Sequence, residues 1–137
     1  MNALDLPAGV KLQRLADPDG VVGTTLVMFM PDVEKTKWAT KAMQAEGVPA
    51  GGIYDAKVKN WHIYTHWEHI MEQKAVALDG LPWSGVKKAE LPAYAPDMCP
   101  QTLDYLSRSI MISIAQHFSA AHCRAIAEGI NKVLAKA

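Results

Sequence analysis

The 137-residue chain has no excess of charge, because 14 lysines and arginines balance 14 aspartates and glutamates. A neutral chain with dispersed lysines lacks the basic surface that attracts nucleic acid or an anionic membrane. A long hydrophobic run is also missing. The longest, 21–30, is interrupted by Gly23 and two threonines, and about 20 apolar residues are needed to span a bilayer. We therefore expect neither nucleic acid nor a membrane among its partners.

Cysteine is scarce as well. Cys99 and Cys123 have a spacing that fits no metal or redox motif. The sequence leaves open whether they ever pair, and two reduced, partly buried thiols are the simpler interpretation. Residues 1–9 contain neither the basic nor the apolar region of a secretory signal. The expected location is the cytoplasm.

Common catalytic motifs are absent too. The sequence has no Gly-x-Ser-x-Gly, and the glycines of 47–52 are wrongly spaced for a phosphate loop or a dinucleotide fingerprint. The run His66-Trp67-Glu68-His69 is not the zinc-protease motif, in which the glutamate directly follows the first histidine. Serine hydrolase, nucleotide-hydrolysing and dinucleotide-dependent activities therefore have no support.

Turn and capping residues divide the chain into strands and helices. The turn at 17–20, Asp-Pro-Asp-Gly, separates a possible edge strand at 10–15 from an expected buried central strand at 21–30. Asp32 and Gly47 are typical of the two ends of a helix. Further strands are predicted at 48–54 and 110–114, an extended stretch at 60–64, and helices at 65–75, at 100–107 and after Ser119.

The segment 78–100 is rich in proline and is expected to be irregular, which often marks a binding loop or a surface wrap. Gly129 weakens the last helix by about 1 kcal/mol relative to alanine, so packing must compensate. The mixture of short strands and helices predicts a single α+β domain over 1–137. Its sheet should be short, antiparallel or mixed, with helices packed on it.

Three segments in a fixed order resemble one enzyme family along nearly the whole chain. The segments are Val21–Met30 with the later Ala45-Glu46-Gly47-Val48, then Trp61–Glu68, and finally Cys99-Pro100 with Ser107–Ile114 and a closing amphipathic helix. In this order the chain resembles the C-terminal small domain of the DegT/DnrJ/StrS pyridoxal-phosphate-dependent sugar aminotransferases. The resemblance implies a homodimer in which the small domain packs on a large domain and faces a nucleotide-linked or free keto or amino sugar.

The resemblance also implies substrate-binding residues. His66 matches the family's histidine, Glu68 falls where its glutamine stands, and Arg108 matches the arginine before the final strand. Tyr64 and Ser113 replace family prolines, which bears on the choice of sugar. The expected substrate-binding set is His62, Tyr64, His66, Trp67, Glu68 and Arg108. These residues would orient the sugar, and none is expected to be catalytic.

The family's transfer of an amino group from glutamate or glutamine to a keto sugar requires a lysine that forms a Schiff base with pyridoxal phosphate, and a carboxylate facing the pyridinium nitrogen. No segment of this sequence matches that machinery. We expect the cofactor on a large domain, supplied in cis or in trans, and no cofactor on this chain alone. The sequence leaves open whether the chain is a natural short protein or a fragment of a longer enzyme.

The candidate residues have structural alternatives. Tyr64, His66 and Trp67 can line the sugar side of a cleft or pack a turn between elements. Arg108 can hold an anion or pair with Asp104, one helical turn earlier.

Two rival functions remain open at this stage. The first is a free-standing metabolite- or protein-binding module without catalysis. The second is a metal-binding protein, because His62, His66 and His69 would share one face of a continuous helix.

Overall fold

The computed structural model describes residues 3–55 and 57–137; residues 1 and 2 of the stretch considered for a signal lie outside this range. The chain divides into two compact units. The first, called the sheet unit, extends to Ile53 and resumes at Asp104. The second, called the insert, covers Tyr54–Leu103. A single domain was expected, and each unit is described by itself below.

The sheet unit is built on four antiparallel strands in the order β1-β2-β4-β3. The strands are β1 (Lys11–Leu12), β2 (Thr25–Phe29), β3 (Ala50–Gly52) and β4 (Ser109–Ser113). In the central pair, Met28 lies opposite Ile110 and Leu26 opposite Ile112. The predicted α+β class and antiparallel sheet are confirmed.

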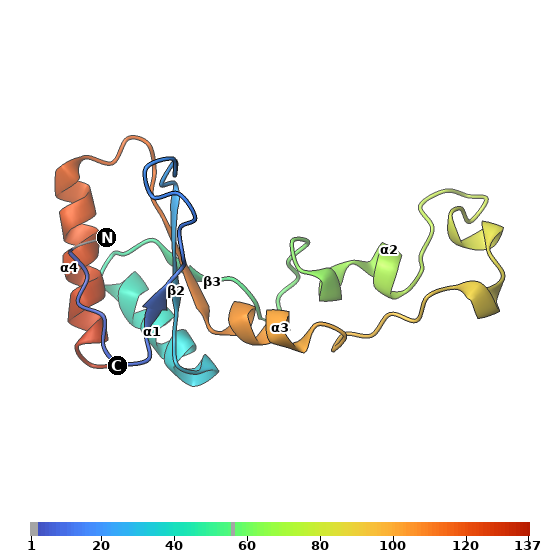
Figure 1. Ribbon diagram of the computed structural model, residues 1–137, viewed down its shortest axis with the longest axis horizontal. Helices are drawn as coiled ribbons and strands as arrows, with labels where there is room; N and C mark the ends of the chain where they lie inside the picture. Colours follow the sequence, from blue (N-terminus) through green and yellow to red (C-terminus); the bar gives the residue numbers. More distant parts are fainter. Residues whose placement is uncertain (1–2, 56) are drawn as a thin grey trace. The chain divides into compact units, whose positions relative to one another are not determined.

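Two helices, α1 (Val33–Ala45) and α4 (Ala120–Leu134), pack on one face of this sheet (Figure 1). Asp32 caps α1 by accepting a 2.7 Å hydrogen bond from the Lys35 amide, and Gly47 follows its end with a φ of +77°. Ser119 begins α4 in a reciprocal capping box with His122. The end signals read from the sequence are thus confirmed for both helices.

The core lies between the helices and the sheet. Met28, Met30, Ile110 and Ile112 are fully buried there, and helix α4 contributes Ile130. These strand residues alternate with outward-facing ones, as the period of a strand requires.

The opposite face of the sheet, called the open face, carries Val27, Phe29 and Met111. Met111 is 41% exposed. The ring of Tyr105, from α3 (Pro100–Ser107), contacts the edge of the Phe29 ring at 5.8 Å.

Several predicted elements are shorter than expected. Strand β2 begins at Thr25, and Val22 is 86% exposed, so the central strand predicted from residue 21 was wrong in its first four positions. Gly23 has a φ of +73°, a left-handed conformation that ends extended pairing there. The strands predicted at 10–15 and 48–54 are confirmed only as β1 and β3. Cys99 and Cys123 are both free and exposed, which corrects the expected partial burial.

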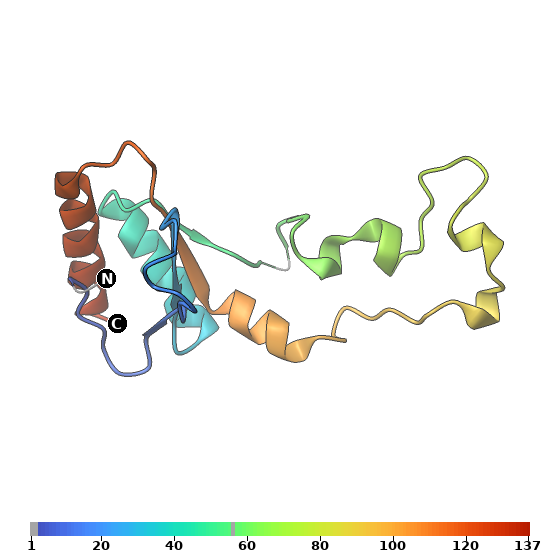
Figure 2. The same ribbon diagram turned by 45° about the horizontal axis from the view of Figure 1, so that its top comes forward.

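The insert has little regular structure, as Figure 2 shows, and Ile63 is the buried hydrophobic residue among its described part. Its short helices are η1 (Tyr64–His66), α2 (Glu68–Met71), η2 (Trp83–Gly85) and η3 (Lys88–Glu90), and α3 begins near its end. The irregular 78–100 segment is confirmed.

The continuous helix expected over 65–75 was wrong, and so was the extended conformation expected for Tyr64. Trp67 interrupts the helix with φ −82° and ψ 81°, while its indole N–H donates to the Trp61 carbonyl at 2.7 Å. Within the described part of the chain, no helix has the length and apolar character needed to cross a membrane.

Candidate functional site

The expected substrate-binding residues are distributed over both units. Five of them, His62, Tyr64, His66, Trp67 and Glu68, lie in the insert between residues 60 and 71, and Arg108 lies in the sheet unit. The insert residues surround a tight turn organised by Asn60, and this turn is the candidate site.

Asn60 determines the state of His66. The Asn60 amide N–H donates to His66 Nδ1 at 2.8 Å, and the Asn60 carbonyl oxygen lies 3.1 Å from the same nitrogen. An amide N–H can only donate, so Nδ1 accepts and the proton of the neutral imidazole sits on Nε2. His66 Nε2 forms no hydrogen bond with the described residues and is therefore a donor available to a ligand.

The same asparagine also holds His62. Asn60 Oδ1 accepts from the His62 amide at 3.0 Å and lies 3.1 Å from His62 Nδ1. Asn and Asp side chains that bind the backbone two residues on are typical of tight turns. His62 is an exposed residue, and these contacts hold its ring beside the turn.

The ring of His66 is also fixed by stacking. It lies on Tyr54 with ring centroids 6.0 Å apart and planes inclined by 30°. Offset stacking of this kind restricts the imidazole plane, so the direction of Nε2–H is set by both Tyr54 and Asn60.

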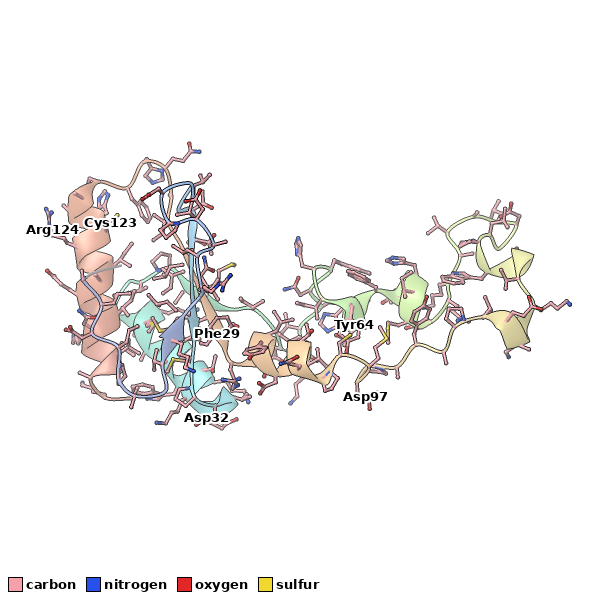
Figure 3. All side chains as sticks on the ribbon, viewed as in Figure 1. Phe29, Asp32, Tyr64, Asp97, Cys123 and Arg124 are labelled. Atoms are coloured by element: carbon pink, nitrogen blue, oxygen red, sulfur yellow. The ribbon has the colours of Figure 1, made fainter. Side chains whose placement is uncertain are left out.

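Tyr64 joins the turn to a distant part of the insert. Its hydroxyl donates to the Pro96 carbonyl at 2.6 Å and accepts from the Cys99 amide at 3.2 Å. Figure 3 shows the Tyr64 side chain at the turn and the neighbouring segment that carries Asp97. We call this pair of hydrogen bonds the tyrosine clasp. It uses the phenol's donor and one acceptor position within the protein, so Tyr64 acts here as a structural tie.

Trp67 and Glu68 form the other side of the turn. Glu68 forms a hydrogen-bonded ion pair with Lys59, whose ammonium lies 5.1 Å from the centre of the Trp61 ring. The hydrogen bond and charge of Lys59 lower the pKa of the Glu68 carboxyl. Trp67 is 37% exposed, its indole N–H is bound to the Trp61 carbonyl, and the His69 ring stacks on its indole ring.

Arg108 takes the structural alternative that the sequence had left open. Its Nε and Nη2 donate to the two carboxylate oxygens of Asp104 at 3.0 and 2.6 Å, and its Nη1 donates to the Met30 carbonyl at 2.9 Å. The hydrogen bond from Arg108 lowers the pKa of the Asp104 carboxyl, and the same contact raises the pKa of the guanidinium. All three guanidinium nitrogens are therefore engaged: two bind Asp104 of α3, and the third binds Met30, directly after β2.

The three histidines do not form the shared helical face that a metal site would need. Helix α2 contains His69, while His62 and His66 precede the break at Trp67. In residues 3–55 and 57–137, no three histidine, cysteine or acidic side chains are grouped so as to hold a metal ion.

Sequence reasoning missed Tyr54, Lys59 and Asn60. Asn60 could have been identified from the sequence, because asparagine side chains in turns often bind the backbone two residues later. The stacking of Tyr54 and the pairing of Lys59 with Glu68 depend on how the turn closes, and no local pattern encodes that closure.

The described residues do not fit pyridoxal phosphate. A lysine that forms a Schiff base is activated by a desolvated or cationic pocket, whereas each lysine of this chain is exposed. No step of cofactor chemistry is derived from these residues. A search with models of known protein families found no match to the chain.

Proposed function

We propose that this chain is the small domain of a pyridoxal-phosphate-dependent sugar aminotransferase of the DegT/DnrJ/StrS type, and that it holds the sugar side of the substrate. The cofactor and its lysine would belong to a large domain. In this role the chain orients the substrate and excludes water, and it transfers no protons.

The fixed tautomer of His66 is the observation that carries this proposal. Its Nδ1 accepts from the Asn60 amide, which leaves the proton on Nε2, and Nε2 forms no hydrogen bond with the described residues. A hydroxyl or phosphate oxygen of a nucleotide-linked sugar is a suitable acceptor. The exposed rings of Trp61 and Trp67 beside it offer apolar faces on which a sugar can stack.

The exposed apolar surface of both units supports a covering partner. The open face presents Met111, and the insert presents a series of exposed hydrophobic side chains. They are Val58, Trp61, Trp67, Val76, Leu78, Leu81, Val86 and Met98. Extensive exposed apolar surface of this kind marks a protein interaction site. A large domain in cis or in trans would cover it, and a second copy would do so in a homodimer.

The binding role is tested by titrating the purified chain with UDP-N-acetylglucosamine while recording the histidine ring signals by NMR and the tryptophan fluorescence. We expect saturable shifts of His66 together with a fluorescence change. His66→Ala should weaken binding about tenfold, the value of one lost hydrogen bond to a charged or strongly polar ligand.

The matched control is His117→Ala, which removes an exposed histidine that belongs to the sheet unit. It should leave the titration almost unchanged. Equal losses in the two variants, or no saturable response in the wild type, would count against sugar binding at this turn.

The absence of a cofactor site is tested separately. Pyridoxal phosphate is added to the folded chain and the mixture is reduced with borohydride, which makes any Schiff base permanent. We expect no stoichiometric adduct. A single trapped lysine would mean that this chain holds the cofactor itself, and the small-domain proposal would then fail.

A further inference from the structure

An apolar hollow of about 330 Å³ lies in the sheet unit, between Ala3 and Leu4, the chain from Gln13 to the start of β2, and helix α4. Its wall is mostly aliphatic, and the main contributors are Leu4, Leu15, Leu26, Ile114, Ile126 and Ile130. The volume is at the lower end of the roughly 300–1,000 Å³ typical of small-molecule sites. This hollow belongs to the sheet unit, whereas the turn around His66 belongs to the insert.

The hollow is preformed, because hydrogen bonds hold its outer wall against α4. Asn131 Oδ1 accepts from the Asp5 amide at 2.9 Å, and Asn131 Nδ2 donates to the Ala3 carbonyl at 2.8 Å. These two bonds fix the backbone on both sides of Leu4. A ligand would therefore bind against an ordered wall, and little conformational entropy of the protein would be lost on binding.

The charge at the rim limits the chemistry of the occupant. Arg124 contributes to the lining, is exposed, and forms no ion pair or hydrogen bond with the described residues. Figure 3 labels it on helix α4, next to Cys123. Neither an acidic nor an aromatic side chain is among the described residues of the lining. A cationic ligand is thus disfavoured, and an anion with an aliphatic body is complementary.

We propose that the hollow binds a medium-chain aliphatic carboxylate, with its chain among the leucines and isoleucines and its carboxylate at Arg124. The proposal is independent of the sugar site. Cys123 also lines the hollow, close to Arg124 in the chain. Its thiol therefore serves as a reporter of occupancy.

The test is a calorimetric titration of the full chain with octanoate below its micelle concentration, with 1-octanol and octyltrimethylammonium as neutral and cationic probes of equal chain length. Saturable binding of octanoate is expected, with the cation bound weakest. Arg124→Ala should weaken octanoate binding about tenfold and leave octanol binding unchanged. Arg14→Ala is the control, because Arg14 is exposed and adjacent to Gln13 but outside the lining.

A second variant and a labelling assay locate the site. Ala127→Phe, which places a ring in the hollow, should abolish the binding of both octanoate and octanol. Octanoate should also slow alkylation of Cys123 in the wild type, whereas Cys99, in the insert, is the internal reference. No saturable binding, no effect of Arg124→Ala, or equal protection of both thiols would each overturn the proposal.

Discussion

Gly129 of helix α4 lies directly against Val48: a Cβ atom on Gly129 would stand 2.8 Å from Val48 Cγ2. Both residues are buried. A glycine in a helix costs about 1 kcal/mol relative to alanine, and here the close approach of α4 to the segment before β3 explains it. The packing that compensates for the helix-weakening glycine is therefore its contact with the side chain of Val48.

Gly129→Ala should lower the free energy of unfolding by about 1–3 kcal/mol, because the added methyl overpacks the contact by more than the helix gains in propensity. Urea denaturation followed by circular dichroism measures the change. The double variant Val48→Ala/Gly129→Ala tests the cause, since removing the valine methyls makes room. Its loss should be smaller than the sum of the two single losses, and strict additivity would rule out this contact as the reason.

Tyr64→Phe should loosen the segment around Cys99 without changing the unfolding of the sheet unit. The substitution removes the tyrosine clasp, whose two hydrogen bonds join the turn to Pro96 and Cys99. Exchange of the Cys99 amide with deuterium should accelerate about fivefold, since one hydrogen bond contributes about 1 kcal/mol.

Tyr94→Phe is the matched control for the clasp, because the Tyr94 hydroxyl forms no hydrogen bond with the described residues. The Cys123 amide, in α4 of the other unit, is the reference within the same sample. If the Tyr64 and Tyr94 variants exchange at the same rate at Cys99, the clasp contributes nothing to order in the insert.

Asp104→Asn should lower the free energy of unfolding at neutral pH and weaken its dependence on pH in the acid range. Arg108 holds the pKa of Asp104 below its usual value of 3.8. The folded state therefore binds this proton more weakly than the unfolded state. The contribution is fully present above the usual value and disappears as the pH falls through the lowered pKa.

Urea midpoints for the wild type and Asp104→Asn, measured from about pH 7 to about pH 2, test this dependence. The two curves should converge in acid. Asp97→Asn removes an exposed carboxylate without an ion pair among the described residues, and should follow the wild type. Parallel curves for Asp104→Asn and the wild type would contradict a stabilising pair.

Asp32→Ala should destabilise the sheet unit by about 1 kcal/mol, because the Lys35 amide loses its hydrogen-bond acceptor at the start of α1. Asp32→Asn retains an acceptor oxygen and should cost less. Thermal unfolding of the three proteins ranks them. Equal losses in the two variants would show that the carboxylate charge, and not the hydrogen bond, determines the effect.

Met111→Lys should reduce self-association of the isolated chain, because it places a charge in the middle of the open face. Sedimentation equilibrium measures the change in association constant, for which we expect at least about tenfold. Val22→Lys is the control, since Val22 is 86% exposed and lies outside the strands. An equal effect of the two substitutions would indicate general solubility in place of a specific face.

Much of the sheet unit could be predicted from the sequence, because its signals are local. Asp32 and Ser119 begin their helices, and Gly47 follows the end of α1, as capping chemistry predicts. The length of β2 could not be predicted in the same way. Val21 and Val22 have high strand propensity, but β1 offers only two residues for pairing.

The candidate site was predicted less well. The residue types at 62–68 were identified, but their polar groups bind residues outside that range, and Asn60 at the centre was missed. The break at Trp67 is accompanied by an indole hydrogen bond to the Trp61 carbonyl. A helical pattern of apolar residues contains no information about such a bond. The family resemblance pointed to His66. Which of its ring nitrogens carries the proton follows only from its contact with the Asn60 amide.

The insert leaves the sheet after Gly52 and the chain returns to it at Ser109, where Gly52 lies opposite Ile110 in the ladder. Paired residues of antiparallel strands are about 5 Å apart, so the two ends of this excursion are as close as those of a hairpin. A change in its length or composition would thus leave the register of β3 and β4 intact.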